Sequence, residues 1–209
     1  EMNAGERLAP ASITKIATAL VAAERADLSE IVDVEVDGAA LAVETESTIM
    51  GLQPGLDLSM RDLLYGLLLP SGNDAAIAIA EHVAGSVPAF VELMNEKADE
   101  LGLRNTHFVN PHGLDDADQY TSAHDIAVFG LELLRRPELA EIVRSMEYQP
   151  AWDRPAFSNS NRLLFDYPES IGIKIGFTDK AGQTIVAAAE RDGRRIIVSL
   201  LGSSTVYQD

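Results

Sequence analysis

The stretch RLAPASITKIATALVAAE, residues Arg7–Glu24, predicts an alanine-rich helix that begins near Pro10 and runs to about Arg25. Proline is tolerated in a first helical turn, where backbone N–H groups have no intrahelical partner. Because Lys15 is followed almost only by apolar residues, we expect its side chain to be buried. Ser12 precedes it by three positions, which places both side chains on one helix face within contact range. The first chemical feature of the sequence is therefore a serine beside a buried lysine.

Capping, turn and periodicity signals divide the rest of the chain into a helical section and a strand section. The alternating run Ile31–Val36 predicts a short strand, closed by a turn at Asp37-Gly38. Helices are predicted over residues 59–69, 73–84 (capped by Asn73 or Asp74), 87–101 and 122–134. Strand-like runs follow at 170–178, 183–191 and 194–202, the last two joined by a turn at Asp192-Gly193. We predict an α+β fold, in which helices flank an antiparallel sheet that carries an inserted all-helical lobe.

Length and composition predict one globular domain over residues 1–209, split into two lobes. The formal net charge of −17 argues against nucleic acid and against an anionic membrane surface as partners. The absence of cysteine excludes disulfides and thiolate chemistry. The longest apolar runs, such as Leu63–Leu69, are far shorter than the roughly 20 residues that span a bilayer.

Two further motifs give weight to the first one. Ser71-Gly72-Asn73 lies between two predicted helices, where a hydroxyl and an amide can point into a cleft. Lys174-Ile175-Gly176 lies on a predicted strand, where the glycine allows close approach of another backbone. A Ser-x-x-Lys match alone occurs by chance on the order of once in a chain of this size. The three motifs together, in this order and on these elements, indicate a serine nucleophile activated by a lysine base.

The chain resembles the serine-type D-alanyl-D-alanine carboxypeptidases, which are low-molecular-mass penicillin-binding proteins of the penicillin-recognising serine enzyme superfamily. The resemblance covers nearly the whole chain, through PASITKIATALVAAE, LLLPSGNDAAIAIAEH, LGLRNTHFVNPHGLDD, NSNRLL and GIKIGFTDKAG. It implies a β-lactamase/transpeptidase-like fold and an enzyme without cofactor or metal. It also implies removal of the terminal D-Ala from peptidoglycan stem peptides through an acyl-enzyme, acylation by β-lactam antibiotics, and an extracytoplasmic location, with any signal peptide or membrane anchor outside these residues.

The resemblance implies a role for each motif residue. Ser12 attacks the carbonyl of the penultimate D-Ala, and Lys15, held neutral, accepts its proton. Ser71, close to Lys174, relays a proton to the departing D-Ala amine. Asn73 positions Lys15 and the substrate backbone. These five residues form the predicted catalytic set.

Further residues are implied to bind the reacting groups. The backbone N–H groups of Ser12 and Phe177 form the predicted oxyanion hole. The predicted substrate-binding residues are Lys174, Gly176, Thr178 and His112. His112 could also assist deacylation, although a role in bracing its loop is at least as plausible.

The sequence departs from the family pattern at one motif position and at its ends. The family usually has Lys-Thr-Gly as the third motif, and Ile175 cannot supply the threonine hydroxyl that helps to hold the substrate carboxylate. The loss is expected to cost roughly 1.5–3 kcal/mol, with Thr178 as a partial substitute. The family's strands before the first motif, and its helix and arginine after the last strand, have no counterpart here. We therefore expect the sequence to be a piece of a longer protein.

Several alternative interpretations stay open or are set aside. The chain could be a DD-endopeptidase, a β-lactamase of the same superfamily, or a weakened peptidoglycan-binding domain. Against a β-lactamase, the second motif has Gly72, and no Glu-x-x-Leu-Asn loop is found. The triad-like set Ser122, His124 and Asp125 fits helix capping better than catalysis. A loop rich in metal-ligand types is more typical of turns than of a metal site: His107, His112, Asp115, Asp116 and Asp118.

Overall fold

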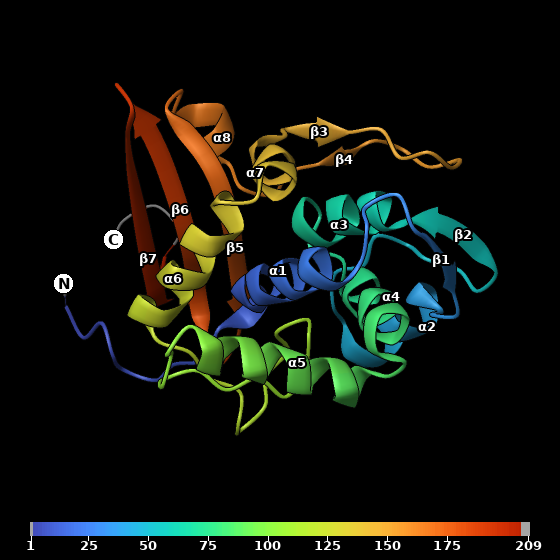
Figure 1. Ribbon diagram of the computed structural model, residues 1–209, viewed down its shortest axis with the longest axis horizontal. Helices are drawn as coiled ribbons and strands as arrows, with labels where there is room; N and C mark the ends of the chain where they lie inside the picture. Colours follow the sequence, from blue (N-terminus) through green and yellow to red (C-terminus); the bar gives the residue numbers. More distant parts are fainter. Residues whose placement is uncertain (1, 206–209) are drawn as a thin grey trace.

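A computed structural model describes residues 2–205 of the chain. Its main sheet is antiparallel, in the order β5-β6-β7, with β5 at Ser170–Thr178, β6 at Gly182–Arg191 and β7 at Arg194–Ser203. The Asp192-Gly193 turn joins β6 to β7, as predicted. Figure 1 shows the sheet on one side of the molecule and a group of helices on the other. The predicted α+β class is confirmed.

The helix predicted from the opening stretch lies between the sheet and the helical lobe (Figure 1). It starts as a 3-10 helix, η1 (Ala11–Thr14), and continues as α1 (Lys15–Arg25). Helices α3 (Met60–Leu68), α4 (Asn73–Ala84), α5 (Val87–Glu100) and α6 (Ala123–Leu134) pack around α1, and η1 packs against β5. The contacts on every side explain why Lys15–Ala22 is buried throughout, since a helix without a solvent-facing stripe lies in a core.

Three helices cover the sheet or its edge. α6 (Ala123–Leu134) packs against β7, while α7 (Pro137–Arg144) and α8 (Leu163–Asp166) pack against β5. Ser122 caps α6 by accepting a hydrogen bond from Asp125 N at 3.1 Å, which confirms the capping interpretation of that triplet. Neither α7 nor α8 is among the helices predicted from the sequence.

The lobe beyond α1 contains α2 (Gly38–Thr45), α3 (Met60–Leu68), α4 (Asn73–Ala84) and α5 (Val87–Glu100). It is not all-helical, because β1 (Ile31–Val34) pairs with β2 (Leu56–Ser59). Alternate residues of β1 are buried, so the apolar side of its period-2 pattern packs against the core. In residues 2–205 no single helix is long and apolar enough to cross a membrane. Helices α4 and α5 taken together meet the requirement by length and composition alone, but they are bent by 86° relative to each other.

Two local predictions in this lobe are wrong. Asp37 does not close a turn but caps α2, accepting a hydrogen bond from Ala40 N at 3.0 Å. Only Gly38 of α2 is buried, so this helix has no apolar stripe that the sequence could reveal. Gly72 is the N-cap residue of α4, and neither Asn73 nor Asp74 caps it. The side chain of Asn73 instead contacts Lys15, and that of Asp74 accepts hydrogen bonds from the backbone of residues 50–52.

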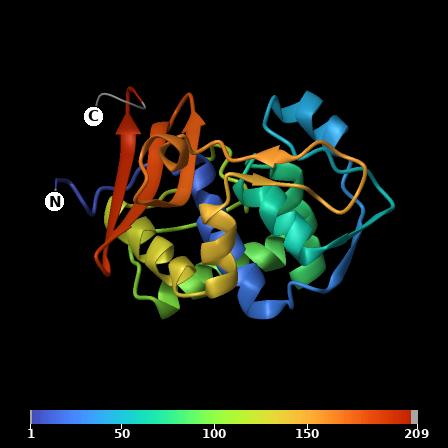
Figure 2. The same cartoon turned by 90° about the horizontal axis from the view of Figure 1, so that it is seen from above.

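A hairpin that was not predicted extends over the helical lobe (Figure 2). It consists of β3 (Glu147–Tyr148) and β4 (Phe157–Ser158). The ring of Tyr148 stacks on Tyr65 of α3 with centroids 3.6 Å apart, and its hydroxyl donates to Asp62 Oδ1 at 2.9 Å. These contacts attach the hairpin to α3.

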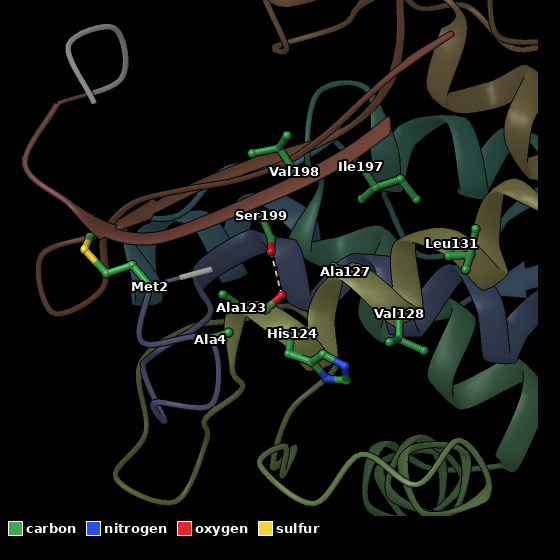
Figure 3. A pocket seen from close by; sticks show the side chains of 10 residues that line it. All are labelled: Met2, Ala4, Ala123, His124, Ala127, Val128, Leu131, Ile197, Val198 and Ser199. Atoms are coloured by element: carbon green, nitrogen blue, oxygen red, sulfur yellow. Dashed lines mark hydrogen bonds between the residues drawn. The ribbon is translucent and has the colours of Figure 1, made fainter. Parts of the chain in front are cut away.

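A largely apolar cavity of about 410 Å³ lies between α6 and β7 (Figure 3). Ala127, Val128 and Leu131 of α6 line it together with Ile197 of β7, and Ser199 Oγ donates to Ala123 O at 2.5 Å. None of the predicted catalytic residues lines this cavity.

Candidate active site

Lys15 is the centre of the candidate active site. Its Nζ lies 2.9 Å from Ser12 Oγ, 2.6 Å from Asn73 Oδ1 and 2.7 Å from the carbonyl oxygen of His112. Ser12 belongs to the 3-10 turn, where three residues per turn bring positions i and i+3 into line. Lys15 is fully buried, as predicted. Burial, and secondarily the charge of Lys174, hold the pKa of Lys15 well below its usual value.

The arrangement around Lys15 suits a neutral amine. A neutral amine has two N–H groups and one lone pair. Asn73 Oδ1 and the His112 carbonyl oxygen are both acceptors, so they can take the two N–H groups. The lone pair is then left for the hydroxyl of Ser12, which is the geometry that a base needs in order to take the serine proton.

The second motif lies in the turn between α3 and α4. Asn73 is the first residue of α4, and its backbone N–H donates to Thr48 O at 2.9 Å. Ser71 has a positive φ of 71°, which is strained for a residue with a side chain. Its buried Oγ has no hydrogen-bond partner among the described residues. A hydroxyl without a partner is available to a substrate or to a neighbouring lysine.

The third motif brings a second buried lysine to the site. Lys174 of β5 is 1% exposed, and its Nζ donates to Ile175 O at 3.0 Å. Burial lowers the pKa of Lys174 to about 7. Lys174 lines a cavity of about 360 Å³ together with Ser12, Ser71 and Ile175. The structure thus brings residues of all three motifs to one place.

Gly176 allows the edge of the sheet to approach the serine. A Cβ atom at this position would lie 2.6 Å from Ser12 N, a distance that real side chains do not tolerate. Phe177 follows it, with a 58% exposed side chain, and lines the cleft on which Ser12 also borders. The backbone N–H groups of Ser12 and Phe177 thus belong to segments that meet here, as an oxyanion hole requires.

The two remaining predicted residues lie in a wider cleft of about 630 Å³ in front of Ser12. Thr178 donates its hydroxyl to Asp115 Oδ1 at 2.7 Å, so this hydroxyl is already engaged across the cleft. His112 Nδ1 accepts from Leu114 N at 3.2 Å. Burial, followed by the charge of Lys15, lowers the pKa of His112 to about 3. The ring is therefore neutral near pH 7 and carries its proton on Nε2.

Comparisons with known proteins show the family of the chain. Residues 1–205 match the D-alanyl-D-alanine carboxypeptidase family of peptidases. The chain belongs to this family. A D-alanyl-D-alanine carboxypeptidase of Bacillus subtilis is 38% identical over 207 residues, which cover 97% of this chain and 53% of that protein.

Solved structures of related proteins have the same fold. The Streptomyces K15 DD-transpeptidase superposes with a TM-score of 0.91 at 30% identity, over 97% of this chain and 83% of that one. A D-alanyl-D-alanine carboxypeptidase from Mycobacterium tuberculosis gives a TM-score of 0.86 at 36% identity, over 94% and 74%. The chain spans about half the length of the curated relatives that it matches.

Several residues that line the cleft of this D-alanyl-D-alanine carboxypeptidase family member are not among the predicted site residues. Thr48 borders both cavities at Ser12, and Ser160 lines the smaller one. Ser160 donates its hydroxyl to Leu69 O at 3.1 Å, just before the second motif. Ser160 lies within the NSNRLL stretch, whose resemblance to the family could have indicated a site residue there. Nothing in the sequence around Thr48 indicates a functional site. In residues 2–205 no three His, Cys, Asp or Glu side chains are grouped so as to hold a metal ion.

Proposed function

We propose that residues 1–209 form the catalytic domain of a serine DD-carboxypeptidase that acts on peptidoglycan stem peptides ending in D-Ala-D-Ala, on the outer side of the cytoplasmic membrane. The observation that carries the proposal is the buried Lys15, whose Nζ lies 2.9 Å from Ser12 Oγ and whose other two partners are acceptors. The family and its relatives, named for this activity, support the choice of substrate. One continuous hydrophobic core supports a single domain.

In the first step, Ser12 Oγ attacks the carbonyl carbon of the penultimate D-Ala while its proton passes to Lys15 Nζ. The backbone N–H groups of Ser12 and Phe177 stabilise the negative charge on the carbonyl oxygen. The C–N bond then breaks, and Ser71, which lines the same cavity as Lys174, passes the proton from Lys15 Nζ to the leaving D-Ala amine, so that Lys15 is neutral again. Asn73 holds Lys15 in place throughout.

In the second step, water attacks the ester carbonyl of Ser12 and loses a proton to Lys15. The ester C–O bond breaks, the proton returns from Lys15 to Ser12 Oγ, and the shortened peptide is released. A penicillin acylates the same Ser12 when its lactam C–N bond opens. Its leaving nitrogen stays attached to the acyl group, so we expect this adduct to hydrolyse slowly. Lys174, Gly176, Thr178 and His112 are the proposed substrate-binding residues.

The test is incubation of the purified protein with a penicillin and then with a diacyl-D-Ala-D-Ala peptide, beside a Ser12→Ala variant. We expect a covalent adduct on Ser12 and released D-Ala from the wild type only. An adduct without D-Ala release would reject the carboxypeptidase and favour another acyl transfer. Addition of a free amine acceptor would then distinguish transpeptidation, the activity for which the Streptomyces K15 protein is named. Absence of both products would refute a catalytic function.

A further inference from the structure

Asp74, next to the second motif, is a fully buried carboxylate that the proposed mechanism does not use. Its Oδ1 accepts hydrogen bonds from Met50 N at 2.8 Å and Ala75 N at 2.9 Å. Its Oδ2 accepts from Gly51 N at 2.8 Å and Leu52 N at 2.9 Å. Both oxygens are thus saturated by backbone donors, and Asp74 forms no ion pair with any described residue.

These bonds join two walls of the site. Asp74 follows Asn73 directly, so its carboxylate is fixed relative to the Lys15 partner. Residues 50–52 continue back to Thr48, which borders the cleft and accepts the hydrogen bond of Asn73 N at 2.9 Å. One carboxylate therefore holds the start of α4 and the wall around Thr48 together.

The surrounding backbone leaves room for this carboxylate. A Cβ atom on Gly38 would lie 2.6 Å from Asp74 Oδ2, and one on Gly72 would lie 2.8 Å from Asp74 Oδ1. Gly38 does not need a positive φ, so close approach to Asp74 and Leu52 is the constraint there. The carboxylate occupies a site shaped to its size.

The charge of Asp74 also acts on Lys15. Two charged groups act on this lysine, Lys174 from β5 and Asp74 from α4, and His112, in the loop before Gly113, contacts it through its carbonyl oxygen. The His112 ring is neutral near pH 7 because its pKa is lowered to about 3. Burial and Lys174 lower the pKa of Lys15, whereas Asp74 raises it. Asp74 is the negative charge in this balance.

We propose, on the basis of the function proposed above, that Asp74 is a positioning residue. Its carboxylate fastens residues 50–52 to the start of α4, and its charge limits how far Lys15 is driven to the neutral form. The proton affinity of the base and the shape of the cleft wall then depend on the same side chain.

The decisive variant is Asp74→Asn, which keeps the size but loses the charge and replaces one doubly accepting oxygen by an NH₂ group. We expect the amides of residues 50–52 to exchange with solvent about 10- to 100-fold faster, because bonds to a charged acceptor are lost. Titration of ¹³C-labelled lysine, in a chain with four lysines, should show the Lys15 pKa falling further, because the negative charge that raises it is lost. The acid limb of penicillin acylation should move to lower pH by the same amount.

The direction of the Lys15 shift separates this role from a merely structural one. Loosening that only admitted water would raise the Lys15 pKa, because the desolvation of the amine would be relieved. A rise or no change in that pKa, or unchanged exchange at residues 50–52, overturns the proposal. Exchange and lysine titration need no turnover, so they remain decisive even if the wild type proves inactive, which would refute the proposed function alone.

Two further variants complete the test. Asp125→Asn removes another buried carboxylate, one that accepts from Asn105 N at 2.9 Å, and it should leave the Lys15 titration unchanged. Gly38→Ala crowds Asp74 but keeps its charge, so exchange at residues 50–52 should rise while the Lys15 pKa stays within a few tenths of a unit. If Asp74→Asn does not fold, unchanged exchange in Gly38→Ala overturns the proposal.

Discussion

At the scale of single residues, the site depends on two buried lysines that have no carboxylate partner in the part of the chain that the structure describes. Burial disfavours an ammonium ion, so both pKa values are lowered, and that of Lys174 reaches about 7. The two lysines are not equivalent. Lys15 contacts Ser12, Asn73 and the His112 carbonyl, whereas Lys174 Nζ, within residues 2–205, bonds only to a neighbouring carbonyl and borders the cavity. This difference suits Lys15 as a base and Lys174 as a group that meets the substrate.

Ile175 is the residue whose substitution should raise activity. It lines the cavity that also borders Ser12 and Ser71, so a hydroxyl at this position would face the site. Ile175→Thr should increase kcat/KM for D-Ala release by about one to two decades, because a hydrogen bond to a charged group contributes roughly 1.5–3 kcal/mol. Ile175→Val has nearly the same shape as the threonine variant and should stay within about threefold of wild type. Equal rates for the two variants would contradict the hydroxyl argument.

At the scale of elements, the β3–β4 hairpin is held by one polar cluster under its base. Asp62 accepts from Ser59 Oγ at 2.5 Å, from Tyr148 OH at 2.9 Å and from Ala151 N at 3.2 Å. Burial, and then the hydrogen bond to Asp62, raise the pKa of Tyr148. The hairpin strands are only two residues each, so we expect this cluster to contribute more than the strand pairing.

Tyr148→Phe tests this contribution. The ring can still stack on Tyr65, but Asp62 loses a donor in a buried place, so the free energy of unfolding should fall by about 1–2 kcal/mol. Urea denaturation at pH 7 measures the change. Tyr167→Phe, at a 45% exposed tyrosine outside the cluster, should change the free energy of unfolding by less than about 0.5 kcal/mol. A similar loss in both variants would show that the cluster is not what holds the hairpin.

At the scale of the whole molecule, the buried Lys174 makes stability depend on pH. Its folded-state pKa of about 7 lies below the ordinary value of 10.5. Below pH 7 both states bind the proton, and the burial cost is at its largest. Between pH 7 and about 10 the unfolded state retains a proton that the folded state has lost, so stability rises by up to about 1.4 kcal/mol per pH unit.

Lys174→Met should therefore be more stable than wild type at pH 6 to 7, and its stability should rise less steeply between pH 7.5 and 9.5. Urea unfolding at several pH values measures both effects. Lys180→Met replaces an exposed lysine and should keep the wild-type slope. Equal slopes in wild type and Lys174→Met would mean that Lys174 is not neutral in the folded state.

The sequence determined the local features whose causes lie within a few residues. The Ser59 cap of α3, the left-handed Gly85 after α4 and the Asp192-Gly193 turn follow from side chains and backbone preferences at those positions. The sequence also determined the order of the three motifs and the burial of Lys15, since apolar neighbours leave that lysine no polar face. It did not reveal α2, because a helix with one buried residue has no apolar period.

Only the tertiary structure decided which groups surround Lys15. Asn73 and His112 lie 58 and 97 positions from it along the chain, and no local pattern fixes such contacts. The same holds for Asp74, which the sequence suggested as a helix cap and the fold turns towards residues 50–52. The proton affinity of a buried base depends on every charge around it and on the exclusion of water. Both arise only when distant segments pack together.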